Sequence, residues 1–136
     1  MTSKPITVPE ISADSTIVAA LDLSDLRLMN DSRFPWLILV PRVEATEIID
    51  LSATDRARLL DEIAIVSTAL RDVTQCYKLN VAALGNLVRQ LHVHVIARFT
   101  SDAAWPKPVW GSGEAVAYKP ADRDRLVSEI LGALPR

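Results

Sequence analysis

The chain has 136 residues, of which 49% are hydrophobic and 24% are charged, and this length suits one domain over residues 1–136 with its own core. Its net charge of −2 does not favour a nucleic acid polymer as partner, because polymer binding relies on an excess of Lys and Arg. A single cysteine, Cys76, and the lack of any apolar run of membrane-spanning length predict a reduced, cytoplasmic protein with no membrane attachment.

The first 40 residues predict a polar lead-in followed by two strands. Residues 1–16 contain two prolines and are expected to be extended. Residues 26–29 alternate weakly and precede a turn signal at 30–32. Residues 36–40 form a continuous apolar run, which is typical of a central strand covered on both faces. The two runs together predict an antiparallel hairpin.

Residues 53–75 predict a long helix. Ser52 can accept a hydrogen bond from the backbone near Asp55, and Asp55 complements the positive end of the helix dipole. Apolar residues then recur at steps of four and three, which draws one stripe along the helix, with Glu62 away from it. We expect this stripe to cover a sheet. Its members are Leu59, Ile63, Val66, Leu70 and Val73.

The second half of the chain predicts two more strands and a final helix. Residues 77–83 alternate in polarity and end at a turn signal, Gly85-Asn86. Residues 90–99 carry the strongest strand pattern in the chain. Residues 101–113 contain two tryptophans among prolines and glycines. They are expected to form a loop whose tryptophans either cap the core, which we favour, or shape a pocket. Residues 123–134 predict the final helix.

The strand at 90–99 carries the only two histidines of the protein. Side chains alternate between the two faces of a strand, so Gln90, His92 and His94 share one face. If the strand before it alternates in the same sense, Asn80 faces the same side. We expect the His92 ring to be open to solvent beside His94. The opposite face, expected to lie under the long helix, carries Leu91, Val93 and Val95.

Two imidazoles on a rigid strand suit chemistry on a phosphate. A neutral imidazole nitrogen is a good nucleophile toward phosphorus, and a nearby backbone carbonyl can fix its tautomer. The negative charge that develops on the phosphate oxygens then needs hydrogen-bond donors. The turn at Gly85 and the amide of Asn86 are candidates for these donors.

Two other interpretations of the histidine pair remain open. The pair can have a structural role in a polar sheet face. It can also bind a metal, because His-x-His on a strand is a familiar ligand spacing. A metal site needs a third ligand, and no Asp or Glu lies near the pair in the sequence.

The segment Gln90-Leu91-His92-Val93-His94-Val95-Ile96 resembles the signature of the histidine triad (HIT) superfamily, which is His-φ-His-φ-His-φ-φ with φ an apolar residue. The order of the predicted elements is similar to that family over about residues 15 to 100. Pro41-Arg42 after an apolar strand and Gly85-Asn86 before the motif are similar as well.

This resemblance implies an α+β fold, an antiparallel sheet covered by one long helix plus a C-terminal helix, and a homodimer. It implies a hydrolase or nucleotidyl transferase without a cofactor that forms a nucleotidyl-histidine intermediate. The implied substrates are dinucleoside polyphosphates or nucleoside phosphoramidates. His92 takes the place of the family's nucleophile, and His94 the place that contacts the phosphate or leaving group. Residues in further substrate-binding places are Asn86, Asn80 and Asn30.

The sequence departs from the family pattern at three places. Gln90 replaces the first histidine, and Gln forms hydrogen bonds but does not titrate. Ala97 replaces a frequent proline, and Pro35-Trp36 replaces a frequent Gly-His pair. We expect Gln90 to help position the phosphate. Its presence leaves an alternative function open, a nucleotide-binding module with weak catalysis.

Overall fold

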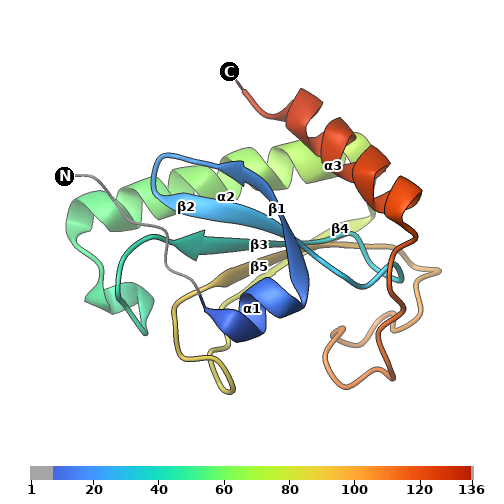
Figure 1. Ribbon diagram of the computed structural model, residues 1–136, viewed down its shortest axis with the longest axis horizontal. Coiled ribbons are helices and arrows are strands. Elements are labelled where there is room, and N and C mark those ends of the chain that lie inside the picture. The colour runs from blue at the N-terminus through green and yellow to red at the C-terminus, as the bar shows by residue number, and fades with distance from the viewer. Residues whose placement is uncertain (1–7, 136) are drawn as a thin grey trace.

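The computed structural model describes residues 8–135 and contains a five-stranded antiparallel sheet in the order β1-β2-β3-β5-β4 (Figure 1). The α+β fold with a long helix and a C-terminal helix is confirmed. Within the described residues, no helix combines the length and apolar character that crossing a membrane requires. In chain order the elements are α1 (Pro9–Ala13), β1 (Ser15–Ala20), β2 (Ser24–Met29), β3 (Trp36–Pro41), the 3₁₀ turn η1 (Ile48–Asp50), α2 (Ala53–Thr74), β4 (Lys78–Ala82), β5 (Val93–Arg98) and α3 (Pro120–Ala133).

The predicted hairpin of β2 and β3 is confirmed. The two strands pair antiparallel, with Leu28 opposite Leu37 and Leu26 opposite Leu39. Every residue of β3 is buried, because the strand lies between β2 and β5 and both of its faces are covered. The uninterrupted apolar run is therefore explained by burial on both faces of the strand, as the sequence predicted.

The expectation of an extended lead-in is wrong for residues 9–13, which form helix α1. The part of that expectation that concerns residues 1–7 lies outside the described residues. Pro9 suits the first turn of a helix, where its missing N–H costs nothing. The helix is too short for a helical pattern to be visible in the sequence, and Ile11 is its one buried residue.

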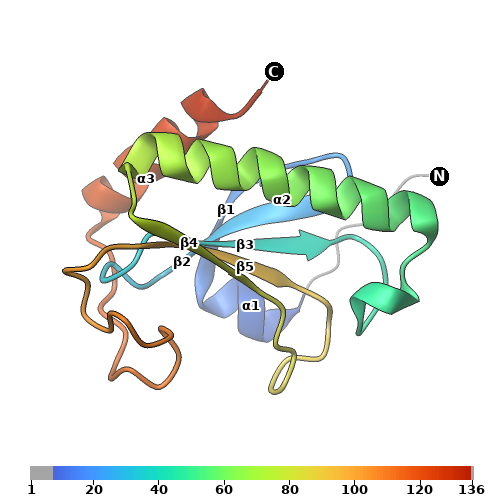
Figure 2. The ribbon, with the colours of Figure 1, turned by 180° about the vertical axis from the view of Figure 1, so that it is seen from behind.

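Helix α2 covers one face of the sheet (Figure 2). Its start is as predicted, because the Ser52 hydroxyl accepts from the Asp55 N–H at 3.1 Å. Helix α2 ends at Thr74, and the next residue, Gln75, has a left-handed backbone (φ 54°). The predicted stripe forms the core against the apolar face of β5, with Ile130 of α3 added to it. The buried members of this core include Leu59, Val66, Leu70, Leu91, Val93 and Val95.

Glu62 departs from the pattern, because it was expected away from the buried stripe and is buried. Its carboxylate Oε2 accepts from the Leu23 N–H at 2.8 Å. The residue therefore ties the β1–β2 turn to α2, while its other carboxylate oxygen, Oε1, is buried without a hydrogen-bond partner among residues 8–135.

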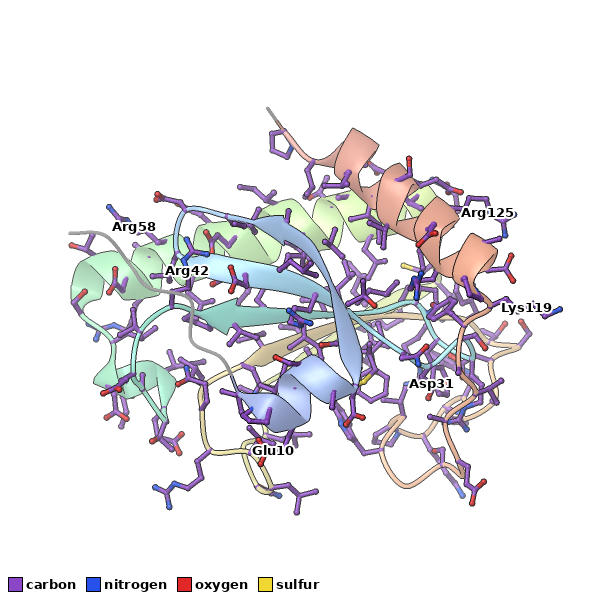
Figure 3. The ribbon with its side chains drawn as sticks, viewed as in Figure 1. Glu10, Asp31, Arg42, Arg58, Lys119 and Arg125 are labelled. Carbon is purple, nitrogen blue, oxygen red and sulfur yellow. The ribbon has the colours of Figure 1, made fainter. Side chains whose placement is uncertain are left out.

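The other face of the sheet is covered too, by α1 and the long segment between β5 and α3 (Figure 1). Arg98 at the end of β5 holds this segment through the carboxylate of Asp102, with 2.8 Å between Nε and Oδ2. Asp31, at the β2–β3 turn, accepts from the Val116 N–H at 3.4 Å (Figure 3). The second core on this face contains Ile11, Phe34, Trp36, Ile38, Val40, Ile96, Ala104 and Val109.

Strand boundaries near the histidines are shorter than predicted. β5 begins at Val93, so residues 90–92 precede it, and β4 loses one residue at each end. Helix α3 begins three residues earlier than expected, at Pro120. Tyr77, which directly precedes β4, and Val81 within it are 70% and 47% exposed, because β4 is the edge strand of the sheet.

Candidate functional site

The two histidines lie side by side where β5 begins. His92 directly precedes the strand and His94 is its second residue. Their rings meet edge to face, with 4.9 Å between the centroids. The expectation of an open His92 ring is wrong, since His92 is 8% exposed and His94 is 5% exposed. The second core was not foreseen, and it closes over this face of the sheet.

The His92 ring is oriented by its own backbone segment. Its Nδ1 lies 2.7 Å from the carbonyl oxygen of Gln90. A carbonyl only accepts hydrogen bonds, so Nδ1 of the neutral ring carries the proton and Nε2 keeps its lone pair. The expected orienting carbonyl is confirmed.

His92 lines a cavity of about 220 Å³. The other walls come from the segment after β3 and from the turn after β4. Gly85 stands in this turn with φ 70°, a backbone conformation that favours glycine. The turn and His92 are therefore brought together, as predicted. The remaining lining residues are Thr46, Glu47, Ile48, Ile49, Ala83, Leu84 and Leu91.

His94 is enclosed by two tryptophans. The indole Nε1–H of Trp36 donates to Nδ1 of His94 at 2.9 Å. The Trp110 ring packs edge to face on His94, with 5.0 Å between the centroids. Burial, together with the nearby His92, lowers the pKa of His94 to about 4. His94 is therefore neutral at physiological pH.

Gln90 does not lie against the cavity of His92. Its amide nitrogen donates to the carbonyl of Val43 at 3.1 Å. Longer contacts reach the carbonyls of Leu91 at 3.3 Å and Pro41 at 3.4 Å. The amide thus joins the start of the motif to the end of β3 and the residues that follow it. The sequence predicted instead that this amide helps to position a phosphate.

The three asparagines are not gathered at His92. Asn86 is exposed beside the turn that lines the cavity. The Asn80 side-chain oxygen accepts from Arg98 at 2.8 Å, and that of Asn30 accepts from the Tyr118 N–H at 2.9 Å.

Asn30 lines a second cavity of about 350 Å³ together with Trp36 and Trp110. The two tryptophans thus lie between this cavity and His94. Trp110 has both roles that the sequence allowed, since it packs and lines a cavity. Trp105 packs against Tyr77, with 5.5 Å between the ring centroids.

Sequence reasoning missed Trp36 as a site residue and recorded it only as a departure from a family pattern. The alternation in β3 places Trp36 and Ile38 on one face. Only the pairing of Ile38 with His94 brings that face next to the histidine. The sequence contains no signal for this register.

Within residues 8–135, no three His, Cys, Asp or Glu side chains gather closely enough to hold a metal ion. Residues 8–135 thus provide no third ligand for the metal site considered from His92 and His94.

Comparison with known proteins places the chain in a family. A family model described as HIT domain matches residues 10–101, more than half of the chain. None of the curated proteins matches the chain. Among solved structures, the histidine triad protein blr8122 from Bradyrhizobium japonicum is 44% identical, with a TM-score of 0.94, and the match covers 96% of this chain and 98% of that one.

Two further crystal structures are similarly close. A histidine triad protein from Sinorhizobium meliloti is 41% identical, with a TM-score of 0.93 and coverage of 95% of this chain and 96% of that one. One from Marinobacter aquaeolei is 40% identical, with a TM-score of 0.89 and 92% coverage of both chains. The chain therefore belongs to the HIT domain family, that of the histidine triad proteins.

Proposed function

We propose that this protein is a nucleotide hydrolase or nucleotidyl transferase that works through a nucleotidyl-histidine at His92. Membership of the HIT family supports a nucleotide-binding, hydrolase-type function. The observation that carries the finer proposal is the His92 ring on a cavity wall, with Nδ1 2.7 Å from the Gln90 carbonyl. This contact leaves Nε2 as a free lone pair, which is what attack on phosphorus needs.

The reaction has two steps. Nε2 of His92 attacks the α-phosphorus of the nucleotide, a P–N bond forms, and the P–O or P–N bond to the leaving group breaks. The leaving group takes the electron pair of the broken bond and a proton from solvent. Water then attacks the same phosphorus, a P–O bond forms, the P–N bond to His92 breaks, and a water proton passes to solvent. The nucleoside monophosphate leaves, and the free lone pair on Nε2 of His92 is restored. Another acceptor in place of water gives nucleotidyl transfer.

Groups around the cavity support the binding of a phosphate. Gly85 places its turn on the cavity wall, and Asn86 follows it. We propose that backbone N–H groups of this turn and the Asn86 amide donate to phosphate oxygens, with His94 beside them. We propose that Gln90 acts indirectly, because its amide holds the backbone at the start of the motif. Asn80 also acts indirectly, through its hydrogen bond with Arg98.

The substrates that we propose are dinucleoside polyphosphates or nucleoside phosphoramidates. We propose that Asn30 contacts the nucleoside from the cavity that it shares with Trp36 and Trp110. A cytoplasmic location, a single domain over residues 1–136 and the lack of a cofactor remain predictions from the sequence.

The decisive experiment traps the intermediate. Wild-type protein is mixed with a phosphoramidate of adenosine monophosphate labelled in the phosphate, quenched and digested, and the adduct is mapped by mass spectrometry. We expect the label on His92. His92→Ala should lower turnover by about 10³-fold or more and lose the adduct. His94→Gln is the matched control, which should lower turnover but keep label on His92. Label on His94, or undiminished turnover by His92→Ala, would contradict the proposal.

One observation favours a second candidate, a nucleotide-binding module with weak catalysis. Gln90 donates to backbone carbonyls, so it supplies no proton to a leaving group. Calorimetric titration with adenosine nucleotides, followed by a search for cleaved product, separates the two candidates. Binding without turnover would favour the module, and a gain of activity in Gln90→His would strengthen that conclusion.

We also propose that the protein forms a homodimer. Large apolar side chains are exposed near the edge strand β4, namely Ile49 at 82%, Leu87 at 98% and Val81 at 47%. Exposed apolar groups in this number often mark an interface. Light scattering over a dilution series measures the mass in solution, and a monomer at all concentrations would contradict a dimer.

A further inference from the structure

The His94 ring is held by a hydrogen bond on one side and by packing on others. Trp36 donates from Nε1 to Nδ1 at 2.9 Å, and the rings of Trp36, Trp110 and His92 all pack edge to face on His94. We propose that Trp36 is a positioning residue that holds His94 in the Nε2–H tautomer, so that His94 acts as a neutral hydrogen-bond donor beside His92. This assignment rests on the proposed function, in which a phosphate lies at His92.

The chemistry of indole determines the tautomer. An indole N–H only donates, so the nitrogen facing it must offer a lone pair. Nδ1 of His94 is therefore unprotonated, and the neutral ring carries its proton on Nε2. Both partners are buried, with Trp36 6% exposed and His94 5% exposed. Protonating Nδ1 would set two N–H groups against each other where water does not replace the lost bond.

Burial and the neighbouring His92 also favour a neutral His94 ring. Burial, and then the His92 imidazole, lower the pKa of His94. Arg98, further along the same face of β5, is paired with Asp102 at 2.8 Å. The pair of Arg33 and Asp31, with 2.9 Å between Nη2 and Oδ2, lines the cavity on the other side of Trp36. Two uncharged side chains pack on the His94 ring from the neighbouring elements. These are Trp36 of β3 and Trp110 of the segment after β5.

The two adjacent imidazoles therefore hold opposite tautomers. His92 has its proton on Nδ1 and a lone pair on Nε2, because Nδ1 faces a carbonyl. His94 has its proton on Nε2, because Nδ1 faces an indole N–H. One ring attacks phosphorus, and the other stabilises charge on the phosphate oxygens by donation. The Nε2 proton stays on His94, so the leaving group takes its proton from solvent.

The tautomer can be measured without any variant or substrate. Nitrogen chemical shifts and long-range proton–nitrogen couplings of a ¹⁵N-labelled sample report which ring nitrogen carries hydrogen. At pH 7.5 we expect Nε2–H for His94 and Nδ1–H for His92. A wild-type His94 that is protonated on Nδ1, or on both nitrogens, would overturn the assignment.

Trp36→Phe removes the donor and keeps an aromatic ring. We expect the pKa of His94 to rise by at least one unit from about 4 toward its ordinary value near 6.5, with a mixed tautomer population. Trp110→Phe is the matched control, because Trp110 contacts the same ring without donating to it. It should retain the Nε2–H tautomer. An unchanged tautomer and pKa of His94 in Trp36→Phe would contradict the role of Trp36.

Kinetics give a readout that a merely structural role would not produce. In Trp36→Phe we expect kcat to fall by about tenfold and by a larger factor than any change in KM, since donation to the oxygens matters most in the transition state. The pH profile of kcat/KM should also gain a decline toward low pH, between about pH 7 and 5, because His94 becomes protonated there. If trapping finds no label on His92 but the tautomers are as expected, the proposed function fails and the assignment to Trp36 stands. An unchanged pH profile in a folded Trp36→Phe would count against Trp36.

Discussion

The two faces of the sheet are held by different kinds of interaction. Under α2, aliphatic side chains such as Leu70 and Val95 pack into one core. On the opposite face, most of the cover is a segment without regular secondary structure, fixed by polar bonds that Arg98 and Asp102 make. The first face needs apolar residues at the right spacing, whereas the second adds particular polar partners to its own apolar core. The histidines lie on the second face, where such partners fix the direction of each ring.

The largest effect should follow from breaking the ion pair on the histidine face. Arg98 is 1% exposed and binds both oxygens of Asp102, and it also donates to the carbonyl of Lys107 at 2.7 Å. Arg98→Met leaves a buried carboxylate without its cation and should cost about 3–5 kcal/mol of the free energy of unfolding. Urea denaturation followed by tryptophan fluorescence measures this loss.

The control for Arg98 lies on the outer side of α3. Arg125 pairs with Asp122 at 3.0 Å, but its side chain is 69% exposed (Figure 3). Arg125→Met should change the free energy of unfolding by less than about 0.5 kcal/mol, because solvent screens exposed pairs. Equal losses in Arg98→Met and Arg125→Met would show that burial does not decide the strength of these pairs.

The helix-covered face should respond to loss of volume. Leu70 on α2 is 0% exposed, and Leu70→Ala should cost about 2–4 kcal/mol through lost burial and the cavity left behind. Leu60 on the same helix is 67% exposed, so Leu60→Ala should cost less than about 0.5 kcal/mol. Thermal unfolding of both variants gives the comparison. A Leu60→Ala loss as large as that of Leu70→Ala would place Leu60 in an interface.

This contrast also explains which parts of the fold could be predicted. The spacing of apolar residues in α2 and the unbroken run in β3 follow from local rules, and both elements were found. The motif at 90–94 placed the histidines together by the alternation of a strand alone. Each of these signals lies within a short stretch of chain, so no knowledge of pairing was needed.

The cover over the histidines could not be predicted in this way. Trp36 reaches His94 across 58 residues of chain, and the Gln90 amide reaches the Val43 carbonyl across 47. Such contacts depend on strand register and on where loops close. For the same reason a local pattern predicted an open His92, whereas the folded chain leaves it on the wall of a small cavity.

The smallest expected effect is a difference between the two faces of the sheet in how the free energy of unfolding depends on pH. Burial alone would raise the pKa of Asp102, but hydrogen bonds from Arg98 and from the N–H groups of residues 99, 104 and 105 outweigh it and lower the pKa to about 2. A carboxyl whose pKa is lower in the folded state stabilises the fold above its ordinary pKa near 3.8. That contribution is lost as the pH falls from about 4 through about 2. It amounts to on the order of 2 kcal/mol.

Asp102→Asn should therefore flatten the dependence of unfolding free energy on pH between about 4 and 2, whatever its loss at neutral pH. Some slope should remain, because the pKa of Asp31 is lowered as well. Leu70→Ala should shift the whole curve and keep the wild-type slope, since no titrating group is removed from the helix-covered face. Urea midpoints at several pH values measure these slopes. Parallel curves for wild type and Asp102→Asn would mean that this carboxylate does not hold the cover on the histidine face.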